Sequence, residues 1–214
     1  SPYLADKIDQ FTDNDVDHPA VIGNVLGQSF QKSNQKVKQD DHPDPFKWLF
    51  IARDDKVKGV DILSETLALL PDERWRLTII GKGDFDALKS AEFSHNITHI
   101  PGLKRPEMVA KMQQHHALIS TSRVETFGMA ILEMLSQGRP VVATRCGGPE
   151  EFVTPVCGIL VAKESPAETA AAMQKIMSDY NAYSPEKISA YAKERYGSRS
   201  FYNKMKEIFN EADL

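Results

Sequence analysis

The sequence predicts an α/β protein built on a parallel, doubly wound sheet, and two observations lead to this fold. Over residues 47–162, short apolar runs alternate with amphipathic segments whose apolar residues recur at helical spacing. Glycine or proline closes several of these segments, as expected where a helix or strand ends. Strands that alternate with helices in this way form a parallel sheet, which binds ligands at the carboxyl ends of its strands.

Each element of this alternation has its own signal. The first apolar run leads into a helix whose apolar residues recur from Val60 to Leu70, and Pro71 stops that helix. Pro106 suits the first turn of a later helix, where its lack of an N–H group does no harm. The expected strands are Lys47–Ala52, Trp75–Ile80, Ile97–Ile100, Ala117–Ser120 and Val141–Thr144. The other expected helices begin near Phe85 and span Phe127–Gln137.

The segments outside this alternation differ in composition. Gly27–Pro45 is rich in Gln, Lys and Asp and poor in apolar residues, so we expect a mobile loop or linker there. Upstream of it, the patterns predict one helix over Ser1–Phe11 and a lone strand over Val21–Leu26. Further helices are expected at Ala167–Met177, Ser184–Tyr196 and Arg199–Phe209. The resulting division is an interdomain segment and linker at 1–46, a sheet domain at 47–180, and C-terminal helices at 181–214.

The composition excludes several classes of protein. A formal net charge of −4 and a pI near 5.9 give no basic surface for nucleic acid, so we expect no nucleic-acid partner. No apolar run approaches the ~18 residues of a membrane span, and no signal peptide is recognisable. Cys146 and Cys157 lack metal-ligand spacing and the histidines are scattered, so we expect no metal and a reducing, cytoplasmic location.

The most informative stretch of the chain runs from Ser122 to Glu133. Gly128 stands at a helix start, where it lets a ligand approach the first free backbone N–H groups, which form an anion site. Glu125 precedes this helix and Glu133 interrupts its apolar pattern, a conflict that tends to mark a functional site. The stretch predicts a site for a ligand with phosphate and hydroxyl groups. One loop acid and one exposed helix acid without a ligand would fit the same pattern.

Two cations flank the loop after the first strand. Arg53 and Lys58 lie at the carboxyl end of that strand, where Arg offers a planar fork and Lys a point charge to a diphosphate. Solvated loop charges are the alternative, since charged side chains are mostly exposed. The glycine turn at 81–83 fails as a dinucleotide fingerprint because Asp86 stands at its sixth position, and no Walker-type loop occurs.

The two glutamates also invite comparison with glycosidases. The paired carboxyl groups of those enzymes stand about 5–5.5 Å or about 6.5–9.5 Å apart. Eight residues along a helix rise roughly 12 Å, which disfavours a hydrolytic pair unless the chain bends sharply at Thr126. We therefore expect Glu125 and Glu133 to hold different hydroxyl groups of one elongated ligand.

Several short motifs follow one another in a fixed order. They are Arg53 with Lys58-Gly59, Gly81-Lys82-Gly83, Pro101-Gly102, Ser122 to Gly128 with Glu133, Gly138 to Thr144, and Gly147-Gly148 with Glu151. In this order they resemble the donor-binding half of the retaining family-4 (group 1) glycosyltransferases, over about residues 19–178. The resemblance implies a Rossmann-like sheet, the C-terminal half of a GT-B fold. Departures from the common pattern occur at Gly23, Val25, Thr121 and Thr126.

The resemblance also implies roles for the candidate site residues. Arg53, Lys58 and Glu125 would be the catalytic residues, the two cations on the donor diphosphate and the acid on the transferred sugar. Glu133 would hold the ribose hydroxyl groups. The remaining donor-binding residues would be Gly81, Leu103 and Lys104, of which the last two would contact the base, and Phe127, Gly128, Met129 and Ala130 in the phosphate cradle. Fixed cations and a helix N-terminus stabilise the leaving group, so this chemistry needs no metal or other cofactor.

Partners follow from the same resemblance. The donor would be a nucleoside diphosphate sugar based on UDP or GDP, and a half preceding Ser1 would bind the glycan or glycolipid acceptor. Through that half, the full-length protein could lie peripherally at the inner face of a membrane. We expect this chain alone to bind the donor without turning it over. Two other interpretations stay open, a non-catalytic nucleotide-binding module and a sugar-nucleotide epimerase of the same architecture.

Overall fold

The structure, a computed structural model, describes residues 23–32, 43–53, 56–71, 74–83, 85–89 and 91–211. The helix expected at Ser1–Phe11 lies outside these residues, as does most of the expected loop before the sheet. Within the described part of the chain, no helix combines the length and the apolar composition needed to cross a bilayer.

A six-stranded parallel sheet forms the centre of the molecule, in the order β3-β2-β1-β4-β5-β6. Its strands are β1 (Phe46–Ile51), β2 (Trp75–Ile80), β3 (Ile97–Ile100), β4 (Ala117–Ser120), β5 (Val141–Thr144) and β6 (Gly158–Val161). The predicted doubly wound sheet is therefore confirmed. Strand order reverses between β1 and β4, and a crevice for ligands forms at such a switch point, outside the carboxyl ends of the strands.

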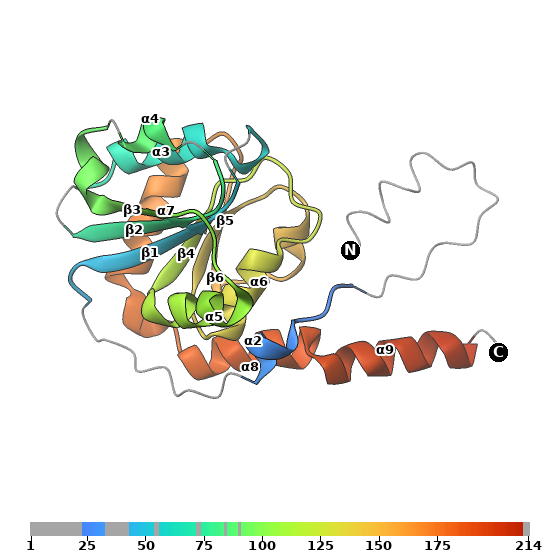
Figure 1. Cartoon of the computed structure of the whole chain (residues 1–214). Helices are drawn as coiled ribbons and strands as arrows, with labels where there is room; N and C mark the ends of the chain where they lie inside the picture. The colour runs from blue at the N-terminus through green and yellow to red at the C-terminus, as the bar shows by residue number, and fades with distance from the viewer. Residues whose placement is uncertain are drawn as a thin grey trace.

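Helices cover both faces of the sheet (Figure 1). One face carries α3 (Val60–Ala68), α4 (Asp86–Lys89) and α7 (Pro166–Ser178). The other carries α2 (Gln28–Gln31), α5 (Arg105–Gln114), α6 (Met129–Ser136) and α8 (Pro185–Tyr196). Short 3-10 helices stand at Lys56–Lys58 (η1), Glu92–Asn96 (η2), Gly148–Glu151 (η3) and Tyr180–Ala182 (η4).

One hydrophobic core lies between the sheet and these helices. Trp48 and Trp75 on adjacent strands are fully buried, and the β5 run Val141–Thr144 is buried throughout, as expected for a strand covered on both faces. The C-terminal helices pack onto this core: Ile176 on α7 and Ile188 on α8 are fully buried. Both cysteines are buried and unbonded.

Two predictions about the N-terminal flank were wrong, and one strand was missed. Residues 23–27 do not pair as a strand, and Leu26 instead donates its N–H to the Tyr196 carbonyl (2.8 Å). Part of the expected loop is helix α2, because Phe30 is buried against the core and orders the residues around it. Strand β6 was not predicted, since its four residues are too few for a clear periodic signal.

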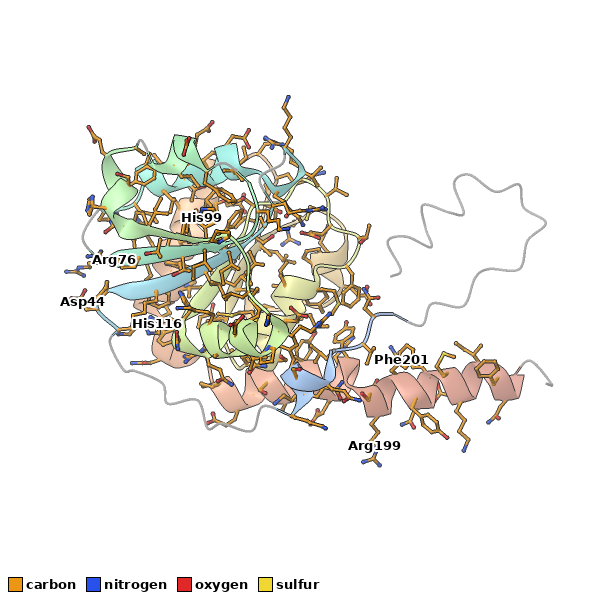
Figure 2. All side chains as sticks on the ribbon, viewed as in Figure 1. Asp44, Arg76, His99, His116, Arg199 and Phe201 are labelled. Atoms are coloured by element: carbon orange, nitrogen blue, oxygen red, sulfur yellow. The ribbon has the colours of Figure 1, made fainter. Side chains whose placement is uncertain are left out.

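Helix α9 (Ser198–Glu211) follows α8 and extends away from the rest of the described structure (Figure 1). Arg199 and Phe201 point to opposite sides of this helix (Figure 2). Its apolar side also carries Tyr202, Met205 and Phe209, of which Tyr202 and Phe209 are exposed. The helix is thus amphipathic.

Candidate functional site

The strand order brings the two most informative loops together. The loop with Arg53 and Lys58 follows β1, and the loop with Glu125 follows β4. Because β1 and β4 are neighbours in the sheet, the two loops leave it side by side at the switch point. The sequence gives no direct sign of this adjacency.

Hydrogen bonds and close packing fix one loop against the other. The Thr121 hydroxyl lies within hydrogen-bond distance of the carbonyl oxygens of Lys58 (3.1 Å) and Gly59 (2.8 Å), and the Arg123 N–H donates to the Val57 carbonyl (2.7 Å). Gly59 has a φ of +64°, and a Cβ there would lie 2.2 Å from the Thr121 carbonyl oxygen. The backbone of Lys58 is therefore held at a fixed place relative to the β4 loop.

Arg123 reinforces this arrangement from the outside. Its guanidinium makes two hydrogen bonds to Asp61 (2.9 and 2.8 Å), two to Glu164 (2.6 and 3.0 Å) and one to the Lys56 carbonyl (2.6 Å). The hydrogen bond from Arg123 lowers the pKa of Asp61, and the two carboxylates raise the pKa of Arg123. These groups are solvated, so the network fixes geometry more than it adds stability.

Lys58 and Glu125 form the central contact of the site. The Lys58 Nζ lies 2.5 Å from Glu125 Oε1, and the Ser122 hydroxyl donates to the same oxygen at 2.9 Å. The side chains of Lys58 and Glu125 are 25% and 18% exposed. The cation expected at a diphosphate and the acid expected at a sugar are thus paired with each other.

The segment after Glu125 turns into α6 and presents its N-terminus to the same place. Gly128, the N-cap, has a φ of +93° that favours glycine, and the first donor inside the helix is the Ile131 N–H, which bonds to the Gly128 carbonyl (3.0 Å). The N–H groups of Met129 and Ala130 precede that bond, so the helix gives them no acceptor. These donors and the helix dipole favour an anion here.

Packing holds this turn in place. Phe127 is buried and its ring contacts those of Phe152 (5.3 Å between centroids) and Tyr196 (5.6 Å). A Cβ on Gly148 would lie 2.3 Å from the Cα of Phe127, so only glycine lets the β5 loop approach this closely. On the backbone, the Glu125 N–H donates to the Cys146 carbonyl (3.1 Å) and the Gly148 N–H to the Glu125 carbonyl (2.8 Å).

Glu133 has a different environment from Glu125. It is the fifth residue of α6, its side chain is 15% exposed, and burial raises the pKa of its carboxyl group. The exposed Arg105 at the start of α5 lies 3.6 Å from Glu133 Oε1. This contact is longer than the Lys58–Glu125 contact, and its cation is more solvated.

A cavity of about 250 Å³ opens at the meeting point of these elements. Of the eleven residues predicted for the donor site, six line it. They are Lys58, Glu125, Phe127, Gly128, Met129 and Ala130. In the described part of the chain, no three His, Cys, Asp or Glu side chains gather in a way that could hold a metal ion.

The other five predicted residues lie off this cavity. Arg53 is exposed and Glu133 lies deeper along α6. Gly81 has a packing role, because a Cβ there would lie 1.7 Å from the Ala52 carbonyl oxygen. Leu103 is half-buried against the core, and the exposed Lys104 is the N-cap of α5, donating its N–H to Glu107 (2.7 Å).

Residues that were not predicted as part of the site also contribute to it. Asn24 lines the cavity from the segment before α2. Thr121 fixes the Lys58 loop, and Arg105 faces Glu133. Thr121 was noticeable in the sequence as a departure from the common pattern, whereas the places of Asn24 and Arg105 depend on tertiary packing alone.

Comparisons with known proteins agree on one family. The family model described as "Glycosyl transferases group 1" matches residues 31–195. A D-inositol 3-phosphate glycosyltransferase of Paenarthrobacter aurescens is 29% identical over 177 residues, which are 77% of this chain and 43% of that protein. One of the same name from Pseudarthrobacter chlorophenolicus is 33% identical over 67% of this chain and 38% of that protein.

Solved structures show the same fold. The apo form of the lipopolysaccharide outer core galactosyltransferase WaaB superposes with a TM-score of 0.82 at 21% identity, over 97% of this chain and 60% of that chain. Anabaena HepE in complex with UDP superposes with a TM-score of 0.69 at 22% identity, over 78% and 49% of the two chains. The chain spans less than half the length of the two curated relatives described above.

Proposed function

Because the chain belongs to the group 1 glycosyl transferases and has the fold of the C-terminal half of a GT-B enzyme, we propose that it binds a nucleoside diphosphate sugar beside Lys58 and Glu125. It would supply the donor half of a retaining transfer of a hexose to a glycan or lipid acceptor. The observation that carries this proposal is one cavity lined by a cation, an acid and a helix N-terminus. HepE, a protein with the same fold, is known in complex with UDP and glucose.

The arrangement suits a leaving group that gains negative charge. As the bond between sugar and diphosphate breaks, the sugar becomes oxocarbenium-like and the phosphate takes the electrons. Lys58 and the N–H groups of Met129 and Ala130 would stabilise that charge without reorganising, and the exposed Arg53 would add to this from outside the cavity. The fixed backbone of the Lys58 loop keeps the cation in position for this step.

The two acids would hold hydroxyl groups. Glu125 would accept hydrogen bonds from the transferred sugar, and Glu133, further along α6, from the ribose. Leu103 and Lys104 at the end of β3 would contact the base. The acceptor would bind outside this chain, so we propose that the chain alone binds the donor and does not transfer it. We propose that the enzyme is cytoplasmic and that any contact with a membrane face is made by the part of the protein that binds the acceptor.

A thermal-shift panel of UDP and GDP sugars tests the donor proposal. A ligand at ~100 times its Kd adds roughly 2.7 kcal/mol, which corresponds to a rise in Tm of roughly 5–10 °C for a domain of this size. The same panel on Lys58→Met should show a smaller rise. If no nucleotide or nucleotide sugar raises the Tm of the parent chain at millimolar concentration, the proposed function is wrong.

A further inference from the structure

Lys58 and Glu125 form an ion pair inside the cavity. Lys58 and the Ser122 hydroxyl both contact Oε1 of Glu125, at 2.5 and 2.9 Å. A diphosphate that binds Lys58 competes with Glu125 for its ammonium group. The backbones on both sides are fixed by the bonds of Thr121 and by those between Glu125 and the β5 loop. The exchange of partners therefore falls to the side chains.

Resting on the proposed function, we propose that Glu125 makes this site selective for the sugar-loaded nucleotide over the free nucleoside diphosphate that transfer leaves behind. Once Lys58 turns to the phosphate, the partly buried Glu125 carboxylate keeps the Ser122 hydroxyl as a donor but loses its cation, so further hydrogen-bond donors would stabilise it. The hydroxyl groups of a bound sugar supply such donors. A free diphosphate supplies none.

Charge acts in the same direction. The terminal phosphate of a free nucleoside diphosphate has a second pKa of about 6 and therefore carries more negative charge at neutral pH than a phosphate esterified to a sugar. In the free product this charge lies beside Lys58 and therefore close to Glu125, which repels it. Return of Lys58 to Glu125 then favours release of the product.

Glu133 cannot discriminate in this way. It lies further along α6, its cationic neighbour Arg105 is 3.6 Å away, and the ribose that it would hold is common to donor and product. The proposed selectivity is therefore a property of Glu125 alone, and Glu133 provides an internal comparison.

Calorimetric titration of the 214-residue chain with UDP and UDP-glucose, and in parallel with GDP and GDP-mannose, tests the proposal. Glu125→Gln should tighten binding of the free diphosphate by about three- to tenfold, the range expected from releasing one partly buried ion pair and removing one like charge. Binding of the nucleotide sugar should change by a smaller factor. The Kd of the free diphosphate divided by the Kd of the nucleotide sugar, called the ratio below, therefore falls. Glu125→Asp, which draws the carboxylate back from Lys58, should lower the ratio less and serves if Glu125→Gln does not fold.

Two controls isolate the ion pair. Glu186→Gln removes the same charge from an exposed acid at the start of α8, outside the cavity, and should leave the ratio unchanged. In a Lys58→Met background, Glu125→Gln should tighten binding of the free diphosphate less than it does in the parent, because no pair remains to be broken.

The outcomes separate this inference from the proposed function. If the parent binds both ligands and Glu125→Gln weakens binding of the free diphosphate or leaves the ratio unchanged, selectivity by Glu125 is wrong and the donor site stands. If the parent binds neither ligand of either pair, the proposed function is wrong and this inference is wrong with it.

Discussion

At the amino ends of the strands, here called the amino edge of the sheet, His115 and Arg139 lie just before β4 and β5, where they are buried and bound to neutral partners. At the carboxyl ends of the strands, the carboxyl edge, Lys58 and Glu125 are partly exposed and bound to each other. The His115 ring nitrogens lie 2.7 Å from the Lys111 carbonyl and 2.8 Å from the Thr78 hydroxyl. Arg139 donates to the Tyr180 hydroxyl (2.6 Å) and the Gln113 carbonyl (2.7 Å).

This difference separates polar groups that hold the fold from those available to a ligand. Neutral partners inside the protein cannot be exchanged without leaving buried polar groups unsatisfied, which costs about 1–3 kcal/mol for each group. A partly exposed ion pair contributes little to stability, and a ligand charge can replace one of its members. The first arrangement therefore belongs to the structure and the second to binding.

The largest expected effect is the loss of folding stability in acid that His115 causes. Burial lowers the pKa of His115 from 6.5 to about 4. Between those pH values the unfolded chain binds a proton that the folded chain does not. The free energy of unfolding is therefore highest, as far as His115 is concerned, above pH 6.5 and falls as the pH drops towards about 4. The total loss is on the order of 3 kcal/mol. Chemical denaturation across this pH range measures it.

A non-titrating variant provides the control for this prediction. His115→Asn should flatten the dependence of stability on pH in that range, while His95→Asn, which changes an exposed histidine, should not. An equally steep dependence in His115→Asn would assign the acid sensitivity to other groups.

At the carboxyl edge, the two cations should differ. Lys58 lines the cavity and Arg53 is exposed, so Lys58→Met should weaken nucleoside diphosphate binding by about ten- to hundredfold. Arg53→Met should weaken it by less than about threefold in the isolated chain, because a solvated charge interacts weakly. Calorimetry distinguishes the two, and a larger loss for Arg53→Met would move the diphosphate site outward from the cavity.

Glu133 tests the ribose end. Glu133→Ala should weaken binding of the free nucleotide and of the nucleotide sugar by the same factor, about tenfold, since both ligands carry the ribose. The comparison with Glu125→Gln, for which opposite effects on free diphosphate are expected, makes the assignment of the two acids testable by titration. A loss confined to the nucleotide sugar would exchange their roles.

The smallest effect concerns the stability of the free protein. Burial raises the pKa of Glu133, so its ionised form opposes folding above the folded-state pKa, and this penalty is relieved as the pH falls through that value. Glu133→Gln should therefore have a higher Tm than the parent at neutral pH, and the difference should narrow as the pH is lowered. If Glu133→Gln instead has a lower Tm than the parent at neutral pH, and this deficit shrinks in acid, Arg105 and Glu133 form a stabilising pair.

Much of the fold could be predicted because local and global signals agree. The strands β1 to β5 are short apolar runs bounded by turns, and they were predicted within about a residue at each end. Strand β6 and helix α2 were not, for different reasons. The run Gly158–Val161 is too short for its period to be read, and Phe30 is a single apolar residue whose burial is decided by tertiary packing.

The candidate site divides in the same way. Lys58, Glu125 and the start of α6 could be proposed from chemistry and position, because each follows a strand or opens a helix. Their pairing could not, since it depends on β1 lying next to β4, and no local pattern specifies strand order. The contact of Thr121 with the Lys58 loop depends on that adjacency too.

One paired measurement tests the separation between the two edges most directly: the Tm without ligand and the Kd for the nucleoside diphosphate, for the parent, Lys58→Met and His115→Ala. We predict that Lys58→Met loses at least about tenfold in affinity while its Tm changes by no more than about 3 °C. His115→Ala should lose roughly 5–10 °C in Tm and bind nearly as tightly as the parent at a temperature where it is folded. A Lys58→Met variant that binds like the parent, or that loses as much stability as His115→Ala, would contradict the assignment of the carboxyl edge to ligand binding.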